Sequence, residues 1–213
     1  MDSEKRRPRG RPRVFDRDKA LETALTLFWR HGYEGTSIAD LTAAMGVTPP
    51  SLYAAFGSKE QLYYQALDRY RASHGAFVAH ALAEEATARG AIARVLREAV
   101  LVYAEGPKPR GCMLATGALN CAPEHADVTA DLAARRRAAI AAIAARLARA
   151  AAEGELPPTT DTAGLAAYYA AIVQGLSIQA RDGVDRAILD TIVETALSVW
   201  PRHDGPDPVP PAR

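Results

Sequence analysis

Alanine recurs throughout this chain of 213 residues, whereas only 7% of the residues are aromatic. Alanine has the highest helix propensity of the amino acids, and the β-branched and aromatic residues that suit strands are scarce here. The sequence therefore predicts an all-α fold. Hydrophobic residues make up 48% of the chain and charged residues 24%, which is ordinary for a globular protein with a buried core.

The small net charge of +1 hides an uneven distribution along the chain. The first 13 residues form a basic arm that contains Lys5, Arg6, Arg7, Arg9, Arg11 and Arg13 against only Asp2 and Glu4. The rest of the chain is slightly acidic. Such an arm is either a solvated tail or a contact to nucleic acid, and charge alone does not decide between the two.

The sequence gives no sign of secretion or of membrane insertion. The basic N-terminus is not followed by the apolar stretch of a signal peptide. Residues 162–180 carry no charge, but they are rich in alanine and glycine and contain Gln174, Ser177 and Gln179, so a buried helix is expected. Two cysteines do not make a disulfide scaffold in a chain of this length. We expect a cytoplasmic protein with no membrane partner.

Three short helices are predicted in the N-terminal quarter. Asp16 is placed to cap the first, which His31-Gly32 ends. Ser37 and Asp40 resemble a capping box for the second, which runs to about residue 44 before the turn at Gly46. The third covers about residues 49–56, with Thr48 as N-cap and two prolines at the first positions, where a missing N–H costs nothing.

Longer helices are predicted in the rest of the chain, to make about nine in total. Ser58 and Gln61 form another capping box, and the predicted helices cover residues 59–86, 91–103, 127–153, 161–181 and 184–200, with an uncharged central segment at 111–121. We therefore divide the chain into a flexible basic arm (1–13), a helix-turn-helix domain (14–58), a helical domain for ligand binding and dimerisation (59–200) and a disordered, proline-rich tail (201–213).

The pair of helices joined by Met45-Gly46-Val47 is typical of a helix-turn-helix. Leu52 and Phe56 are four residues apart and can pack inward, which leaves Tyr53 and several small residues facing solvent. A narrow helix of this kind fits the major groove, with hydroxyl groups on phosphates and small groups against base edges. Lys59, at the start of the next helix, offers a cation to the DNA backbone.

Residues 15–63, which include ALTLFWRHGYEGTSIADLTAAMGVTPPSLYAAFGSKEQLY, resemble the DNA-binding domain of the TetR/AcrR family almost position by position. The resemblance implies a transcriptional regulator and not an enzyme: a homodimeric repressor that a small-molecule inducer releases from a palindromic, double-stranded DNA operator. It also implies a recognition helix at residues 48–55. The residues expected to contact DNA are Arg9, Arg11, Arg13, Thr36, Ser37, Thr48, Pro49, Pro50, Ser51, Tyr53, Ala54 and Lys59.

These residues have different expected roles. By the same resemblance, Thr36, Tyr53 and Lys59 clamp phosphates, while Pro49, Pro50, Ser51 and Ala54 face the bases. Arg9-Gly10-Arg11-Pro12 has the form of an AT-hook core, which places arginines in an A·T-rich minor groove. A constitutive architectural DNA binder that uses this arm remains an alternative, and salt-dependent binding without sequence preference would indicate it.

The last two predicted helices carry the expected dimer interface, because a palindromic operator mirrors a two-fold protein. Small residues at spacings of three and four suit close helix packing, although the same pattern also suits an internal core. The residues expected at the interface are Gly164, Ala167, Ile172, Gly175, Leu176, Ile192 and Trp200.

A pocket for a small, mostly apolar inducer is expected in the helical domain. The residues expected to bind it are Tyr103, Cys112, Met113, Tyr168, Tyr169 and Gln174. No metal site, cofactor or catalytic motif is indicated.

The two cysteines leave a second hypothesis open, in which a thiol or a soft metal switches the repressor through Cys112 and Cys121. Nine residues apart, they would lie on nearly opposite faces of a straight helix, so a bridge between them needs a break in that helix. Buried cysteines that act as small hydrophobic residues are the competing interpretation.

Overall fold

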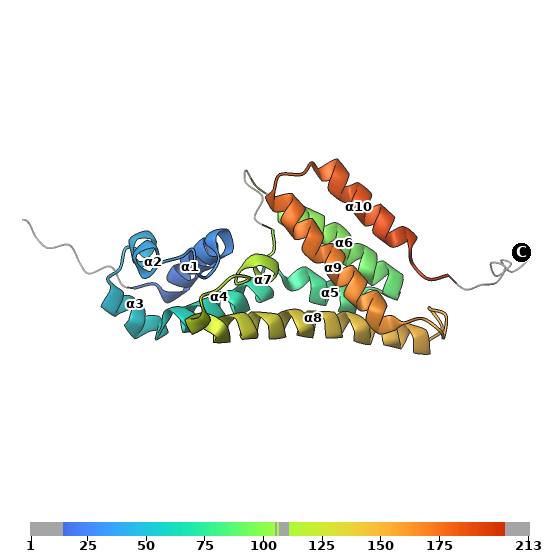
Figure 1. The fold of residues 1–213 in the computed structure, drawn as a ribbon, viewed down its shortest axis with the longest axis horizontal. Helices are drawn as coiled ribbons and strands as arrows, with labels where there is room; N and C mark the ends of the chain where they lie inside the picture. The colour runs from blue at the N-terminus through green and yellow to red at the C-terminus, as the bar shows by residue number, and fades with distance from the viewer. Residues whose placement is uncertain (1–14, 105, 107–110, 203–213) are drawn as a thin grey trace, which may run out of the picture.

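Every regular element among residues 15–104, 106 and 111–202, the part of the chain that the computed structural model describes, is helical (Figure 1). The all-α prediction is confirmed. The helices are α1 (Arg17–His31), α2 (Ile38–Met45), α3 (Pro49–Phe56), α4 (Lys59–Ala72), α5 (Ala76–Glu84), α6 (Ala88–Ala104), α7 (Met113–Thr116), the short 3-10 helix η1 (Pro123–His125), α8 (Ala126–Ala152), α9 (Thr162–Arg181) and α10 (Arg186–Ser198). None of the helices in this part of the chain has the length and hydropathy needed to cross a membrane.

Side-chain caps define the start of the first two helices. The Asp16 carboxylate accepts the N–H of Lys19 at 3.0 Å and begins α1. At α2 the Ser37 hydroxyl accepts the N–H of Asp40, while the Asp40 carboxylate accepts the N–H of Ser37. These caps satisfy backbone N–H groups that have no partner inside the helix, and both were expected from the sequence.

The prediction of one helix over residues 59–86 is wrong, because the chain breaks between α4 and α5. The N–H groups of Ser73 and Gly75 both donate to the Tyr70 carbonyl, which ends α4. The His74 ring packs edge-on against Trp29 of α1, with 4.7 Å between ring centroids, and stacks on Tyr70. These contacts to another helix favour the break, and α5 then leaves in a new direction.

Two hydrophobic clusters form the core, and α8 contributes to both. The first cluster joins α1–α4 and includes Val128 and Leu132 from the start of α8. The second joins α5, α6, α9 and α10 and includes Ile143 and Leu147 from farther along α8. Figure 1 shows α8 running along the molecule beneath both groups of helices. The domain boundary expected at residues 58–59 stays a prediction, while in packing α4 belongs to the first cluster.

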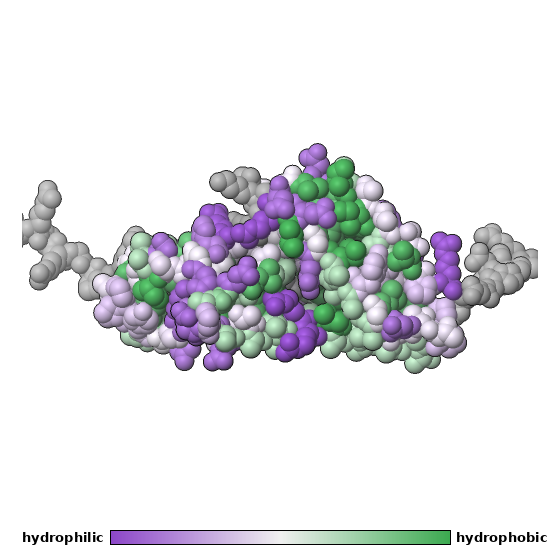
Figure 2. Space-filling model, in the orientation of Figure 1, coloured by the Kyte–Doolittle hydropathy of each residue, from purple (hydrophilic) through white to green (hydrophobic). Residues whose placement is uncertain are grey.

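One face of α9 and α10 is apolar and open to solvent (Figure 2). On α9, Tyr168 and Ile178 are exposed, and Ile188 on α10 and Val199 directly after α10 are more than half exposed. A large apolar patch on a protein surface marks a contact with another molecule more often than an isolated apolar side chain does. This face is therefore a candidate protein–protein interface.

Gly32 fixes the joint between α1 and the segment that contains α7. Its backbone lies at φ 71° and ψ −179°, a conformation that is almost restricted to glycine. The neighbouring Tyr33 N–H donates to the Gly117 carbonyl at 2.8 Å. A Cβ atom on Gly32 would lie 3.0 Å from that carbonyl oxygen, a tight contact, so the close approach of the two backbones also favours glycine.

We expect the substitution Gly32→Ala to reduce the free energy of unfolding by about 2–3 kcal/mol, because it combines backbone strain with a clash. Gly46→Ala is the control: Gly46 has the left-handed helical conformation, and a Cβ atom there would meet no other atom within 4 Å, so only the left-handed penalty of about 1 kcal/mol applies. Urea unfolding followed by circular dichroism measures both. Equal losses in the two variants would contradict this account of the joint.

Candidate nucleic-acid interface and internal cavity

Helix α3 is held by its inner face and exposes its outer face. Leu52 is fully buried and Phe56 is 3% exposed, so both anchor α3 on the first cluster. Gly46, in the left-handed conformation, turns the chain from α2 towards α3. The short turn between two anchored helices has the arrangement of a helix-turn-helix.

The outer face of α3 carries few polar groups. Pro49 and Pro50 occupy its first turn, are exposed and have no N–H to donate. The hydroxyls of Thr48 and Ser51 lie 2.9 Å apart, and Thr48 makes no side-chain cap to the helix. Tyr53 is 45% exposed. Together with the exposed Ala54, these residues have the solvent-facing positions that the sequence predicted for them.

The structure corrects the interpretation of Thr36 and restricts that of Ser37. Thr36 is 1% exposed, and its hydroxyl donates to the Gly32 carbonyl at 2.8 Å. Its side chain stabilises the turn after α1 and is not available to a phosphate. Ser37 is exposed, but its hydroxyl is engaged in the capping box with Asp40.

The Lys59 side chain packs against the ring of Tyr33. Its ammonium nitrogen lies 4.1 Å from the centroid of the Tyr33 ring, a cation–π contact, and partial burial lowers its pKa while Glu34 and Glu60 oppose that shift. The Tyr33 hydroxyl in turn donates to Glu60 at 2.7 Å. The expected phosphate contact of Lys59 stays a prediction. Arg9, Arg11 and Arg13 lie outside the described residues.

Arg17 is a cation near α3 that sequence analysis missed. Its Nε donates to the Ala55 carbonyl at 3.4 Å, its Nη2 donates to Gln65, and its guanidinium lies over the Phe56 ring at 4.9 Å. It therefore fixes the end of α3 against α1 and α4. A single arginine in the first turn of a helix gives no sequence signal that distinguishes this role from an ordinary surface charge.

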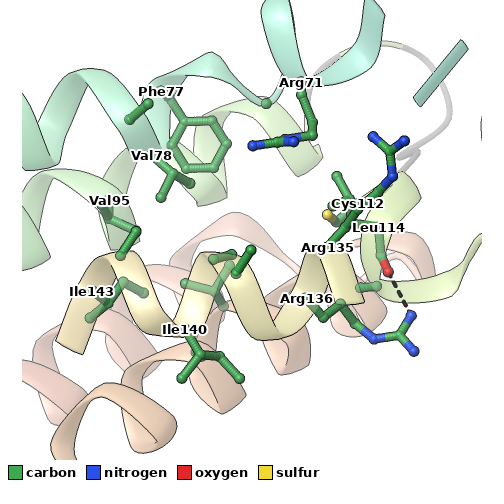
Figure 3. Close-up of a pocket in the computed structure, with 18 of the residues that line it drawn as sticks. Arg71, Phe77, Val78, Val95, Cys112, Leu114, Arg135, Arg136, Ile140 and Ile143 are labelled. Carbon is green, nitrogen blue, oxygen red and sulfur yellow. Dashed lines mark hydrogen bonds between the residues drawn. The ribbon is translucent and has the colours of Figure 1, made fainter. Parts of the chain in front are cut away.

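A cavity of about 490 Å³ lies between α4, α5, α6, α7, α8 and α9 (Figure 3). This volume is within the usual range for small-molecule sites. Of the residues predicted to bind a ligand, Tyr103, Cys112 and Gln174 line it. The break after α4 contributes to it, because Arg71 and Gly75 precede α5 and Phe77 lies in its first turn.

Three residues expected in the pocket lie elsewhere, and those predictions are corrected. Met113 is fully buried in the first hydrophobic cluster. Tyr168 is exposed on the outer face of α9. Tyr169 is buried in the second cluster, and its hydroxyl donates to the Ala196 carbonyl at 3.3 Å. The turns of α9 that face the cavity are those of Ala170, Val173 and Gln174.

The Cys112 thiol lies beside the hydroxyls of two buried tyrosines, Tyr70 and Tyr103. Burial raises the pKa of both hydroxyls, and the neighbouring thiol adds to the shift. The Tyr70 hydroxyl is buried without a hydrogen bond of standard geometry, and the Cys112 thiol and the Met113 backbone are the polar groups nearest to it in effect. An unpaired buried hydroxyl is costly unless something else, such as a ligand, satisfies it.

The two cysteines lie on separate sides of α7. Residues 111–121 do not form one helix, because α7 is a single turn that ends at Gly117. Both pack against the first hydrophobic cluster, but Cys112 also lines the cavity, whereas Cys121 does not. Both are free and half-buried. Within the described ranges no three histidine, cysteine or acidic side chains gather as a metal site would require.

The segment around α7 connects the cavity wall to α1 through hydrogen bonds at both of its ends. The Trp29 indole N–H donates to the Gly111 carbonyl at 2.8 Å, and Tyr33 N–H donates to Gly117. Between them, the Cys112 N–H donates to the Ser177 hydroxyl of α9 at 2.6 Å. Cys112 in the cavity wall is therefore the chain neighbour of a residue, Gly111, that is hydrogen-bonded to Trp29 near the end of α1.

The residues predicted for a dimer interface divide into two groups. Gly164 and Ala167 are exposed, and Ile172, Gly175 and Ile192 are half-buried. Leu176 and Trp200 are 1% and 9% exposed and belong to the second hydrophobic cluster, so the prediction is corrected for these two. The exposed apolar residues Ile178 and Ile188 were missed.

Family models match both the N-terminal and the C-terminal helical regions of the chain. The family model described as "Bacterial regulatory proteins, tetR family" matches residues 20–66, and "Tetracyclin repressor-like, C-terminal domain" matches residues 91–195. The HTH-type transcriptional repressor ComR from Escherichia coli (strain K12) is 38% identical to the chain over 197 residues, which cover 92% of this chain and 94% of ComR.

Solved structures agree with these matches. A cysteine mutant of the TetR family transcriptional regulator CifR, complexed with 26-bp double-strand operator DNA, is similar with a TM-score of 0.85 and 45% identity, covering 90% of this chain and 100% of that one. A TetR transcriptional regulator from Chloroflexus aurantiacus J-10-FL is similar with a TM-score of 0.71 and 28% identity, covering 85% and 92% of the two chains.

Proposed function

Since the chain belongs to the TetR family of bacterial regulatory proteins, we propose that it is a homodimeric repressor that a small-molecule inducer releases from a palindromic operator. The observation that carries the proposal is the rigid presentation of α3, with Leu52 and Phe56 buried beneath an exposed outer face. The similar protein CifR, of which a cysteine mutant was solved in complex with operator DNA, supports operator binding by this chain.

The outer face of α3 suits a major groove that is read mainly by shape and apolar contact. Pro49, Pro50 and Ala54 can approach base edges and thymine methyl groups, and Ser51 supplies a hydroxyl for a hydrogen bond. Tyr53 is placed to donate to a phosphate. The basic arm with Arg9, Arg11 and Arg13 adds phosphate or minor-groove contacts that salt weakens.

Footprinting on the DNA that flanks its own gene should reveal a protected palindrome, and the variant Tyr53→Phe should bind it about fivefold more weakly, because one phosphate hydrogen bond is worth about 1 kcal/mol. Ser51→Ala should lower the preference for the operator over scrambled DNA. Tyr64→Phe is the control, since it removes a tyrosine hydroxyl from α4 on the side that faces Asp127 and Asp131. Unchanged affinity in the Tyr53 and Ser51 variants would contradict this assignment of α3.

A second copy of the chain is the proposed occupant of the apolar face on α9 and α10. Small exposed residues, Gly164 and Ala167, allow two helices to approach closely, while Tyr168, Ile178 and Ile188 supply apolar area. Two-fold assembly through this face would present two α3 helices to two half-sites of one operator.

The substitution Ile188→Glu should therefore convert the dimer to a monomer and abolish cooperative binding to the palindrome, because it buries an unpaired charge at the interface. Sedimentation velocity measures the assembly state. Leu119→Glu provides a matched control, since Leu119 and Ile188 are almost equally exposed at 53% and 54% but Leu119 follows α7, away from this face. A monomeric parent protein, or an Ile188 variant that remains dimeric, would refute the proposed interface.

Release by an inducer requires that the cavity and α3 be mechanically coupled. A ligand that moves α4 at Tyr70 would move the whole helix-turn-helix, because Tyr63 and Leu67 of α4 belong to the same cluster as α1. The hydrogen bonds from Trp29 and Tyr33 to the α7 segment provide a second connection. Coupling is reciprocal, so operator DNA must weaken ligand binding by the same factor as the ligand weakens DNA binding.

A thiol switch is the alternative that one observation favours, namely the Cys112 thiol in the cavity wall. An oxidant or electrophile that modified this thiol would enlarge the side chain against Tyr70 and Tyr103. In this case hydrogen peroxide or N-ethylmaleimide should release the parent protein from its operator and leave the Cys112→Ser, Cys121→Ser double variant bound. Release of both proteins alike would exclude the thiol switch.

A further inference from the structure

The cavity has an apolar end and a cationic end. In Figure 3 the side chains of Phe77, Val78, Val95, Ile140 and Ile143 gather at one end, whereas Arg71, Arg135 and Arg136 lie with Cys112 at the other. The apolar part of a ligand would be shielded from water at the apolar end. The charge that the second end favours depends on which of the three arginines is already neutralised.

Two of the arginines have partners within the protein. Arg135 donates to both Asp68 and Asp131, so its charge is compensated. Arg136 donates to the Leu114 carbonyl at 3.0 Å, and Figure 3 shows its guanidinium turned towards that carbonyl, away from the apolar end. The charge of Arg135 is therefore compensated, whereas Arg136 keeps its charge but directs its guanidinium away from the apolar end of the cavity.

Arg71 is different. It is an exposed residue that lines the cavity, and its side chain makes no hydrogen bond or ion pair with any other residue in the part of the chain that the structure describes. In Figure 3 its side chain extends across the cavity between Phe77 and Cys112. The carboxylate that also lines the cavity, Asp68, is engaged by Arg135. Arg71 therefore places an uncompensated positive charge, as judged from the described residues, at the boundary between the apolar and polar ends of the cavity.

The Tyr70 hydroxyl is a second, independent observation that points to a ligand. Tyr70 lines the same cavity, is fully buried, and its hydroxyl makes no hydrogen bond of standard geometry with any of the described residues. Its high pKa keeps it protonated, so it can donate to an oxygen atom. A guanidinium and a protonated hydroxyl on adjacent residues of one helix end are donors, and both are suited to an anionic oxygen group.

We propose that the cavity binds an organic carboxylate with an apolar body, with Arg71 and Tyr70 as donors to the carboxylate and the body between Phe77, Val95 and Ile143. The inference rests on the proposed function, because it names the chemical class of the inducer. A neutral molecule of the same shape leaves Arg71 and the Tyr70 hydroxyl unpaired, and an organic cation is repelled by Arg71.

Isothermal titration calorimetry of the full chain with decanoate, 1-decanol and decylamine tests the proposal. Decanoate should bind, and the other two should bind at least about tenfold more weakly, since a charge-assisted hydrogen bond is worth about that factor or more. Octanoate should bind more weakly than decanoate by about fourfold for each methylene removed. Equal binding of decanol and decanoate would overturn the proposal.

Substitutions test which residues donate hydrogen bonds to the ligand carboxylate. Arg71→Gln should weaken decanoate binding about tenfold or more and leave decanol unaffected, while Arg71→Lys should retain most of the affinity because it keeps the charge. Tyr70→Phe should weaken decanoate binding several-fold. Arg137→Gln is the matched control, because Arg137 is an exposed arginine of α8 outside the cavity lining. Decanoate affinity that is unchanged in Arg71→Gln would refute the role of Arg71.

A separate titration with operator DNA tests whether the carboxylate acts as the inducer, independently of whether the cavity binds it. Decanoate that binds in an Arg71-dependent way without altering operator affinity supports the ligand class and overturns its role as inducer. Operator binding by a protein that takes up no carboxylate overturns the ligand class and leaves the repressor intact. If no DNA site is found, titration of the protein alone still decides whether the cavity takes carboxylates.

Discussion

The hydrogen bonds that hold the α7 segment are the constraint on which the two halves of the molecule depend. Gly111 accepts from the Trp29 indole and Gly117 accepts from the Tyr33 backbone, so both ends of the segment are tied to the end of α1. All four residues are buried, and a hydrogen bond lost there is not readily replaced by water. The segment is therefore part of the helix-turn-helix domain as much as of the cavity wall.

Helix α8 supplies the second connection, because it is long enough to pack with both hydrophobic clusters. Val128 and Leu132 contact the first cluster, and Ile143 and Leu147 contact the second. Between these two groups α8 carries Arg135, Arg136 and Ile140, which line the cavity. The cavity thus lies where the two cores meet, and an occupant there contacts residues whose positions depend on both.

The sequence predicted the local features of the fold and missed those that depend on distant contacts. Asp16, Ser37 and Gly46 were recognised because a cap or a turn involves residues only three or four positions apart. The break after α4 was missed because His74 packs against Trp29, which is far away in the sequence. Small residues on α9 indicated helix packing, but their spacing alone could not tell which face was internal.

The same distinction applies to the candidate site. The exposed positions on α3 follow from the helical period once Leu52 and Phe56 are taken as buried. The cavity cannot be derived in this way, because six helices contribute to it and its open volume depends on where α5 begins. Arg71 looks like an ordinary solvated charge in the sequence. Its position at the cavity appears only in the fold, where Arg135 engages the Asp68 carboxylate and Arg71 keeps no ion-pair partner among the described residues.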